Sequence, residues 1–513
     1  MIDKRPIRRA LISVYDKGGL DGLLKKLHEE GVTFISTGGT QTFIRSLGFP
    51  CEVVEDLTGY PSILGGRVKT LHPKVFGGIL SRRGEQEDGL QLQHYGIPEI
   101  DLVITDLYPF EQTVATGAPT EEIIEKIDIG GVSLIRAAAK NFADVVVIAS
   151  KGQYETLGKI LEHSGAVSTW AERRMLAQEA FAVTSGYDTA IYRYFSEGER
   201  QVFEEGYFRM AIDNPLPLRY GENPHQQACF YGNLAGVLSQ FHGKEISYNN
   251  MLDIEAALCL IGDFKETTFA VIKHNNACGI ASRTTVEEAW TDALACDSVS
   301  AFGGILVTNT EVTGKAAESI HTIFFEIILA PAYTENALTI LKQKKNRIIL
   351  VYNSQVELPH KQYRSLLNGA LVQDRDDSIQ TSSDLQILTV RKPDAREIED
   401  LLFANKVVKH SKSNAITLVK NKQLCASGVG QTSRVDALRQ AIEKAKSFGF
   451  DLQGAVMASD AFFPFPDCVE IAAEVGITAV IQPGGSVNDA LSVGSCDKHG
   501  LAMVKTGVRH FKH

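Results

Sequence analysis

The sequence has 513 residues, of which 44% are apolar and 22% charged, as in an ordinary globular protein with a large core. The net charge of −10 argues against a general nucleic-acid binder, and no uncharged apolar run approaches the roughly 18 residues of a membrane span. The eight Cys are scattered without a Cys-x-x-Cys pair, which predicts reduced thiols in the cytoplasm and neither a disulfide framework nor a zinc site.

Short apolar strands alternate with amphipathic helices in the first part of the chain, whose charged start, Met1–Arg5, predicts no signal peptide. The pattern predicts strands over 9–14, 33–36 and 145–148 and helices over 19–30 and 170–195. Such alternation is typical of a parallel sheet with helices on its faces. The composition then becomes charged and aromatic over 196–217, where closely spaced prolines place a domain boundary near residue 200.

The second half continues the alternation in two runs. The first run predicts helices over 253–264 and 286–295 and strands over 269–272 and 305–307. The second run predicts strands over 415–419, 455–457 and 479–481 and a helix over 435–448. A polar stretch at 374–377 separates the runs, and no short repeat is visible. We therefore expect an α/β protein with domains 1–200 and 201–513, the second divided near residue 375.

Two glycine-rich segments of the first domain have features of an anion site. Ser36–Thr40 lies between a predicted strand and a helix, where converging N–H groups and hydroxyls suit a phosphate. The alternative is a plain glycine-rich turn, and the segment is neither a Walker A loop nor a dinucleotide fingerprint. Leu64–Pro73 brings Arg67 and Lys69 together; in an extended segment both would face one anion, and otherwise they form a solvated basic loop.

Asp128–Asn141 begins with an acid and a glycine pair and continues as a predicted helix. Arg136 and Lys140 are four residues apart and therefore share a helical face, which serves either proton transfer or plain exposure to solvent. This segment adds a carboxylate and two cations to the candidate chemistry of the first domain.

In the second domain, Lys273 and His274 follow a predicted strand, which would place a cation and a titratable base at a site edge. Such a pair usually has no function by itself, but loop-like segments rich in Gly, Pro and aromatic residues also follow other strands, where α/β proteins bind ligands. These segments are Leu218–Gln226, Ser300–Gly304 and Ser459–Asp467. The aromatic cluster in the last of them suits either the core or a flat heteroaromatic ligand.

Taken together, these segments resemble those of the bifunctional purine-biosynthesis family that joins AICAR formyltransferase to IMP cyclohydrolase. The resemblance covers essentially the whole chain and is carried, in chain order, by Ser36–Thr40, Leu64–Pro73, Asp106–Phe110, Asp128–Asn141, Leu218–Gln226, Lys273–Gly279, Ser300–Gly304, Ser413-Asn414, Gly430–Arg434 and Ser459–Asp467. It implies a methylglyoxal-synthase-like parallel-sheet domain followed by two cytidine-deaminase-like α/β subdomains, without the zinc ligands of true deaminases.

The resemblance also implies two consecutive reactions. The second domain would transfer the formyl group of 10-formyltetrahydrofolate to the 5-amino group of AICAR, and the first would close formyl-AICAR to IMP with loss of water. For the transfer, it implies His274 as the proton-transfer group, Lys273 as the stabiliser of developing charge and Asn414 as the residue that orients the formyl group. The implied nucleotide ligands are Arg219, Tyr220, His225, Phe302 and Gly303, and the implied folate ligands are Arg434, Phe465 and Asp467.

For ring closure, the resemblance implies that Lys69 and Tyr108 stabilise the oxyanion while Asp128 and Lys140 move protons. The implied nucleotide ligands are Ser13, Lys17, Thr37, Gly39, Thr40, Arg67 and Thr70. The chain departs from the family pattern at two places near this pocket: Tyr15 stands where Ser is frequent, and Asp106 where Asn is frequent.

The implied partners are small molecules (AICAR, formyl-AICAR and the folate co-substrate) and a second copy of the chain, in a cytoplasmic homodimer with shared transferase sites. Neither a nucleic acid, a membrane nor a catalytic metal is expected, although Asp460 and His513 match ligands of a structural monovalent-cation site in the family. A regulatory protein that senses a phosphorylated effector is the main alternative. The evidence against it is the joint presence of Lys69, Tyr108, Asp128 and Lys140. A dehydrogenase is disfavoured by the missing dinucleotide fingerprint.

Overall fold

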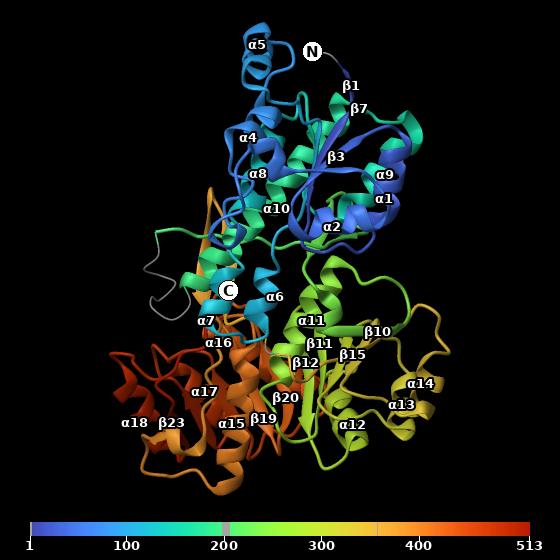
Figure 1. Ribbon diagram of the computed structural model, residues 1–513. Coiled ribbons are helices and arrows are strands. Elements are labelled where there is room, and N and C mark those ends of the chain that lie inside the picture. The colour runs from blue at the N-terminus through green and yellow to red at the C-terminus, as the bar shows by residue number, and fades with distance from the viewer. Residues whose placement is uncertain (1–2, 197–205, 357) are drawn as a thin grey trace. The chain divides into compact units, whose positions relative to one another are not determined.

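The computed structural model describes residues 3–196, 206–356 and 358–513 and forms two compact units, residues 1–213 and 214–513 (Figure 1). Each unit has its own hydrophobic core. The predicted boundary near residue 200 lies outside the described residues. Within the described residues, none of the helices combines the length and the apolar composition that crossing a bilayer requires.

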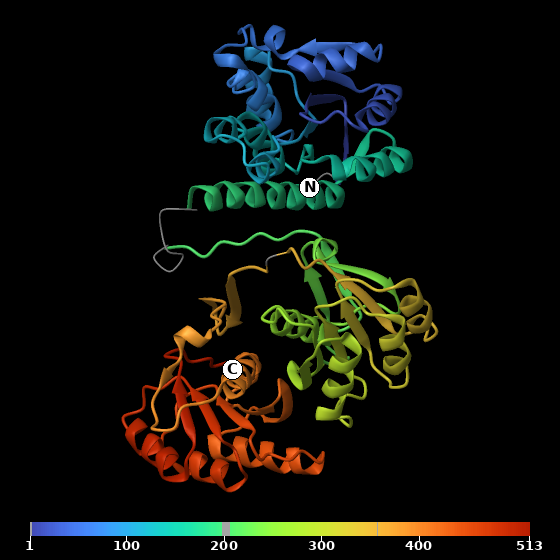
Figure 2. The same ribbon diagram turned by 90° about the horizontal axis from the view of Figure 1, so that it is seen from below.

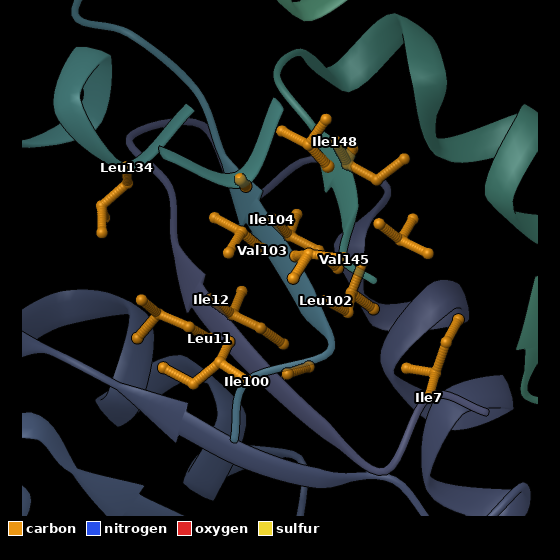
Figure 3. Packing of buried hydrophobic residues seen from close by; sticks show 14 of the residues in the cluster. Ile7, Leu11, Ile12, Ile100, Leu102, Val103, Ile104, Leu134, Val145 and Ile148 are labelled. Carbon is orange, nitrogen blue, oxygen red and sulfur yellow. The ribbon is translucent and has the colours of Figure 1, made fainter. Parts of the chain in front are cut away.

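The first unit is built on a five-stranded parallel sheet in the order β4-β3-β2-β5-β6. Its strands are β2 (Arg9–Ser13), β3 (Thr33–Ser36), β4 (Cys51–Val53), β5 (Leu102–Thr105) and β6 (Val146–Ile148). Every residue of β5 and β6 is buried, as expected for parallel strands covered on both faces. Figure 3 shows aliphatic side chains of neighbouring strands, such as Leu11, Ile12, Val103 and Ile104, packed together in this core.

Helices cover both faces of this sheet. The described helices of this unit are α1 (Leu20–Glu29), α2 (Gly38–Ser46), α3 (Val54–Thr58), α4 (Pro73–Leu80), α5 (Gln86–Tyr95), α6 (Phe110–Ala115), α7 (Thr120–Glu125), α8 (Gly130–Lys140), α9 (Tyr154–Ser164) and α10 (Trp170–Ser196), the long straight helix of Figure 2. Helices α4, α8 and α10 pack together on one face, and α1 and α9 on the other (Figure 1). A small antiparallel pair, β1 (Lys4–Pro6) and β7 (Val167–Thr169), and 3-10 turns at Leu64–Gly66 and Lys151–Gln153 complete the unit.

The second unit is organised around one twelve-stranded mixed sheet made of two similar halves. From the outer edge to the centre, the first half runs β10-β15-β14-β13-β11-β12 and the second half β18-β23-β22-β21-β19-β20. The bounds in the first half are β10 (Leu238–His242), β11 (Thr268–Lys273), β12 (Asn276–Ser282), β13 (Ile305–Thr308), β14 (Ile327–Ala330) and β15 (Ile348–Tyr352). In the second half they are β18 (Gln386–Ile387), β19 (Ile416–Lys420), β20 (Gln423–Gly428), β21 (Val456–Ser459), β22 (Ala479–Gln482) and β23 (Ala502–Lys505).

The helices of the second unit repeat the same duplication. The first half holds α11 (Tyr248–Ile261), α12 (Val286–Cys296), α13 (Gly314–His321) and α14 (Glu335–Leu341), and the second half α15 (Ala395–Lys409), α16 (Arg434–Ser447), α17 (Asp467–Glu474) and α18 (Asp489–His499). One face of the sheet packs against α11 and α15, and the other faces the remaining helices. Outside the large sheet lie two hairpins, β8–β9 (Pro215–Leu218, Ala228–Tyr231) and β16–β17 (Lys361–Leu366, Gly369–Asp374), and 3-10 turns at Leu234–Gly236 and Ser382–Asp384.

The predicted fold class is confirmed, and so are the predicted strands and helices, with small shifts at their ends. The largest shift concerns the helix expected over 253–264, which begins at Tyr248 instead. Ser247 and Asn250 form a capping box there, in which each side chain bonds to the other's backbone N–H. The cap provides hydrogen-bond partners for free backbone N–H groups of the first turn. It thereby extends the helix through residues that have no apolar periodicity.

Candidate active sites

The first candidate site lies at the carboxyl ends of strands β2 and β3. Helix α2 begins directly after β3, with Thr37 as its N-cap residue and Gly38 and Gly39 in its first turn. Thr37 is only 2% exposed, and its Oγ1 has no hydrogen-bond partner among the residues that the structure describes. A helix N-terminus has free N–H groups and a positive partial charge. Together with an unpartnered buried hydroxyl, this end of α2 is suited to bind a phosphate.

Two lysines border the same glycine pair. Lys17 Nζ donates to the carbonyls of Val14 at 3.1 Å and Tyr15 at 2.9 Å. A β-carbon placed on Gly39 would lie 3.9 Å from Lys17 Nζ, and one on Gly38 would lie 3.4 Å from Lys69 Nζ. The glycines thus leave space next to two ammonium groups, which favours an anion there.

Thr40, the next hydroxyl of this helix, has a different environment. Its Oγ1 accepts a hydrogen bond from Val14 N at 3.1 Å and donates one to Val14 O at 2.9 Å. The predicted ligand Thr40 therefore holds the loop after β2, and Ser13 ends that strand.

Both departures from the family pattern shape the wall of this site. Asp106 accepts hydrogen bonds from the backbone N–H groups of Tyr15 and, at 2.9 Å, of Asp16. The Tyr15 ring packs edge-on against Tyr108, with ring centroids 5.6 Å apart. Burial raises the pKa of Asp106 despite these hydrogen bonds. Asp106 thereby fixes the loop that carries Tyr15, and Tyr15 in turn supports Tyr108.

Asp128 lies close to Tyr108, at the start of α8. Its Oδ1 accepts a hydrogen bond from Gly131 N at 2.6 Å, and burial raises its pKa. The pKa of Tyr108 is raised as well, by burial first and then by the negative charges of Asp128 and Asp106. Thr70 joins them, since a β-carbon on Gly130 would lie 3.0 Å from its Oγ1.

Arg67 and Lys140 do not join this cluster. Of the two alternatives for Leu64–Pro73, the extended segment does not form, because Gly65 and Gly66 adopt φ of 67° and 86° and the chain forms 3-10 and turn structure. Arg67 instead forms an exposed ion pair with Glu125. Lys140 ends α8, about 15 Å along the axis from the start of that helix.

Helix α8 leads into the amino end of β6, so Lys140 lies at the opposite edge of the sheet from Asp128 and is exposed to solvent. Within one chain, the two predicted proton-transfer residues are therefore not brought together.

The second candidate site lies at the turn between β11 and β12. The turn has two residues, His274 and Asn275, with φ of 51° and 63°. Positive φ at both positions is the signature of a type I′ hairpin turn, and His and Asn tolerate it better than most residues. Asn275 N donates to Asp253 Oδ1 in α11 at 2.6 Å. The turn presents the His274 side chain to solvent.

Lys273 ties this hairpin to the predicted nucleotide ligands Phe302 and Gly303. Its Nζ donates to Phe302 O at 2.7 Å, and a β-carbon on Gly303 would lie 3.3 Å from the same nitrogen. Gly303 has φ of 69°, so a side chain there would be strained as well as crowded. The Phe302 ring remains 63% exposed, 5.1 Å from that of Phe324, and is free to contact a ligand.

Asn276 joins the two halves of the second unit at this edge. Its Nδ2 donates to His274 O at 2.8 Å, and its Oδ1 accepts from Lys412 N at 2.9 Å. Asn414, two residues further on, therefore lies at the same edge as His274.

The Asn414 amide is almost fully engaged. Its Nδ2 donates to Gln431 O at 3.0 Å and Thr432 O at 3.3 Å, and its Oδ1 accepts from Arg434 Nη2 at 2.9 Å. An amide has two donors and two acceptor lone pairs. Asn414 can thus offer a substrate one acceptor lone pair.

Arg434 links several segments of the protein through hydrogen bonds. Its side chain is 10% exposed, and Nη2 also donates to Asp460 Oδ1 at 2.8 Å while Nη1 donates to Phe462 O at 3.2 Å. This geometry fixes the start of the predicted folate segment, beyond which Phe465 is 57% exposed and Asp467 begins α17.

The predicted nucleotide loop is attached to the same helix as the hairpin. Asn249 Nδ2, in the first turn of α11, donates to Glu222 O at 3.1 Å, one helical turn before Asp253. The Arg219 guanidinium stacks on the Tyr220 ring at 4.8 Å. His225, in the same loop, is exposed. Helix α11 thus positions both the loop and the catalytic candidates.

Sequence reasoning missed the role of the last residues in building this edge. Ser413 N donates to Lys512 O at 2.9 Å, Lys512 N donates to Ser413 Oγ at 3.0 Å, and His510 N donates to Asp460 O at 3.0 Å. No motif marks these backbone contacts, so only the structure could find them.

Asp460, one of the predicted cation ligands, already forms hydrogen bonds within the protein. Its Oδ1 accepts from Arg434 and its Oδ2 accepts from Ala415 N at 3.1 Å, which leaves each carboxylate oxygen one further lone pair. The cation site stays a prediction. Over the parts of the chain that the structure describes, no three His, Cys, Asp or Glu side chains gather as a metal site.

Comparison with known proteins places these sites in a family. The family described as AICARFT/IMPCHase bienzyme matches residues 138–444, and the MGS-like domain matches residues 19–133. A Bacteroides thetaiotaomicron protein named bifunctional purine biosynthesis protein PurH is 65% identical over 513 residues, with 100% of both chains covered. Proteins of the same name from Acetivibrio thermocellus and Persephonella marina are 46% and 45% identical, over 99% of this chain and 100% of each relative. The chain therefore belongs to the AICARFT/IMPCHase bienzyme family, with an MGS-like domain in its first unit.

Proposed function

We propose that this AICAR formyltransferase and IMP cyclohydrolase carries out its two reactions of purine biosynthesis at the two sites described above. The second unit transfers the formyl group of 10-formyltetrahydrofolate to the 5-amino group of AICAR, and the first unit closes formyl-AICAR to IMP with loss of water. The observation that carries the proposal is the meeting of Lys273, His274 and Asn414 at one edge of the sheet, in a chain 65% identical to a named PurH over its full length.

In the transferase site, the AICAR amine is a poor nucleophile because its lone pair is delocalised. His274, at the exposed hairpin tip, accepts the amine proton as the new N–C bond forms. It returns this proton to the folate nitrogen as the bond from the formyl carbon to that nitrogen breaks. A positioned base contributes about 10²–10⁴-fold to the rate. Lys273 stabilises the charge on the formyl oxygen, worth about 3–4 kcal/mol for one such donor. Asn414 orients the reacting groups through its remaining acceptor lone pair.

The exposed rings bind the flat parts of the two substrates. Phe302 and the 219–225 loop hold the nucleotide, while Phe465 stacks on the pterin ring and Asp467 accepts its N–H groups. Arg434 holds the Asn414 amide and the Phe462 segment in register through its two terminal nitrogens, Nη2 and Nη1.

In the cyclohydrolase site, the N-terminus of α2 binds the phosphate together with Thr37 and Lys17. Ring closure is intramolecular, and correct orientation supplies up to about 7–11 kcal/mol. Lys69 and Tyr108 stabilise the oxyanion, and Asp128 moves protons, for which its raised pKa makes it a stronger base. Lys140 requires a second copy of the chain to reach this site, because its own chain holds it at the opposite edge of the sheet.

A homodimer in the cytoplasm is part of the proposal. The hairpin β16–β17 carries exposed apolar side chains, Leu366, Leu371 and the 97% exposed Leu367. An isolated hairpin is at best marginally stable in water, which supports its coverage by a second copy, and light scattering tests this. All eight cysteines are free, as a reducing compartment requires.

The test of function follows AICAR, formyl-AICAR and IMP separately, because spontaneous cyclisation hides a cyclohydrolase defect. Lys273→Ala should abolish formyl transfer while supplied formyl-AICAR is still converted to IMP. The matched control is Lys420→Ala, since Lys420 ends β19 as Lys273 ends β11, next to the other two-residue hairpin turn. Near wild-type transfer by Lys273→Ala would refute the site assignment.

A further inference from the structure

Among the residues that the structure describes, one hydrogen bond from outside the hairpin holds the turn that presents His274. His274 and Asn275 both have positive φ, a conformation that non-glycine residues adopt at a cost. Among the contacts of the described residues, the Asn275 N–H is held by Asp253 Oδ1 at 2.6 Å, from the second turn of α11. A carboxylate that accepts from a backbone N–H forms a strong, charge-assisted bond.

The second half of the sheet has the same arrangement at the corresponding place: an aspartate that accepts hydrogen bonds from the backbone of a two-residue turn. The hairpin β19–β20 also turns in two residues, Asn421 and Lys422, with φ of 55° and 52°. Asp400 accepts from Asn421 N at 2.9 Å and from Lys422 N at 2.7 Å. Asp253 is the sixth residue of α11, and Asp400 is the sixth residue of α15. An aspartate one and a half turns into the covering helix thus holds each left-handed turn.

The two turns differ in what they carry. In the first half the turn bears His274 and follows Lys273, and both side chains lie within electrostatic reach of Asp253. In the second half the residues at the same positions are Asn421 and Lys420, and nothing in the proposed mechanism uses them. The duplication therefore separates the structural role of the aspartate from any role in catalysis.

We propose that Asp253 is a positioning residue for formyl transfer, which holds the Asn275 N–H and so fixes the turn that aims His274 at the substrate. The inference rests on the proposed role of His274. This positioning role requires a hydrogen-bond acceptor in the side chain of residue 253, and it does not require a negative charge there. A displacement of about 1 Å at a reacting group costs about 100-fold in rate.

Three variants test the hydrogen bond. Asp253→Ala should lower kcat for formyl transfer by about 100-fold with KM for AICAR nearly unchanged, because binding groups stay in place. Asp253→Asn, which keeps the acceptor, should retain most of the activity. Asp253→Ala combined with Asn275→Gly should recover at least about 10-fold, because glycine at the second turn position stabilises a type I′ turn without help. Equal losses in Asp253→Asn and Asp253→Ala, or no recovery when Asn275→Gly is added, would overturn the proposal.

The matched control is Asp400→Ala, in which the second turn loses two backbone hydrogen bonds. Thermal unfolding should show a destabilisation at least as large as that of Asp253→Ala, while kcat for formyl transfer stays within about 3-fold of wild type. If Asp400→Ala lost as much kcat as Asp253→Ala, the effect of Asp253 would be explained by a purely structural role. His274→Ala separates the two hypotheses: if it retains formyl transfer, the proposed role of His274 fails, whereas active Asp253→Ala beside inactive His274→Ala overturns this inference alone.

Discussion

Replacing Thr37 with Val tests the phosphate site with two readouts of opposite sign. Thr37 Oγ1 is buried without a protein partner, so the ligand-free protein bears the desolvation cost of a hydroxyl, about 1–3 kcal/mol. Val has the same shape and removes that cost. Because 1 kcal/mol shifts the unfolding midpoint of a domain of this size by about 2–4 °C, we expect the first unit of Thr37→Val to unfold at a higher temperature.

The bound state should change in the other direction. A hydroxyl that donates to a charged phosphate contributes about 1.5–3 kcal/mol, and 1.4 kcal/mol corresponds to a factor of ten. Thr37→Val should therefore bind IMP about 10- to 160-fold more weakly. Titration calorimetry with IMP measures the affinity, and scanning calorimetry of the ligand-free protein measures the stability.

Thr40→Val is the matched control on the same helix. Thr40 Oγ1 exchanges two hydrogen bonds with the backbone of Val14, so this variant should lose stability where Thr37→Val gains it. The reasoning fails if Thr37→Val binds IMP like the wild type, or if it is destabilised in the same way as Thr40→Val.

Two further predictions concern proton transfer in the first unit. Burial raises the pKa of Asp128 in the folded state, so its ionised form costs stability at neutral pH, and this cost disappears as the pH falls through the raised pKa. Asp128→Asn should therefore unfold at the same or a higher temperature at pH 7, yet convert supplied formyl-AICAR about 10²–10⁴-fold more slowly; a drop in stability would contradict the reasoning. Lys140→Ala should make formyl-AICAR accumulate. If a second copy of the chain supplies Lys140, a mixture of the Lys140→Ala and Asp128→Asn proteins should regain cyclisation. No recovery in the mixture would mean that both residues act within one chain.

The elements of the fold could be predicted from apolar periodicity because burial itself sets that periodicity. The strand at 33–36 and the helix that begins at Val286 follow directly from it. The start of α11 could not, since a polar capping box and not an apolar residue decides it. Local chemistry of this kind is invisible to periodicity.

The residues of the candidate sites could be predicted from the sequence, but the residues with which they form ion pairs could not. Motifs at strand ends gave the residues, whereas the partners of Arg67 and Arg434 come from other elements: Glu125 in α7 and Asp460 after β21. The separation of Asp128 from Lys140 is a different case. The expected helix over that segment already placed them at opposite ends, so their separation could have been predicted from the sequence.

The duplication of the second unit also bears on why we propose one transferase site and not two. Antiparallel pairing of β12 with β20 places the two hairpin turns at opposite ends of the sheet. At one end, the small side chain of Asn276 bridges the halves and leaves His274 exposed. At the other end, Arg283 occupies the corresponding space, where its Nη1 donates to Asn421 O at 2.8 Å and its Nε pairs with Asp292 at 2.5 Å. A long arginine thus spans that edge, and the proposed transferase site lies at the other edge, where His274 is exposed.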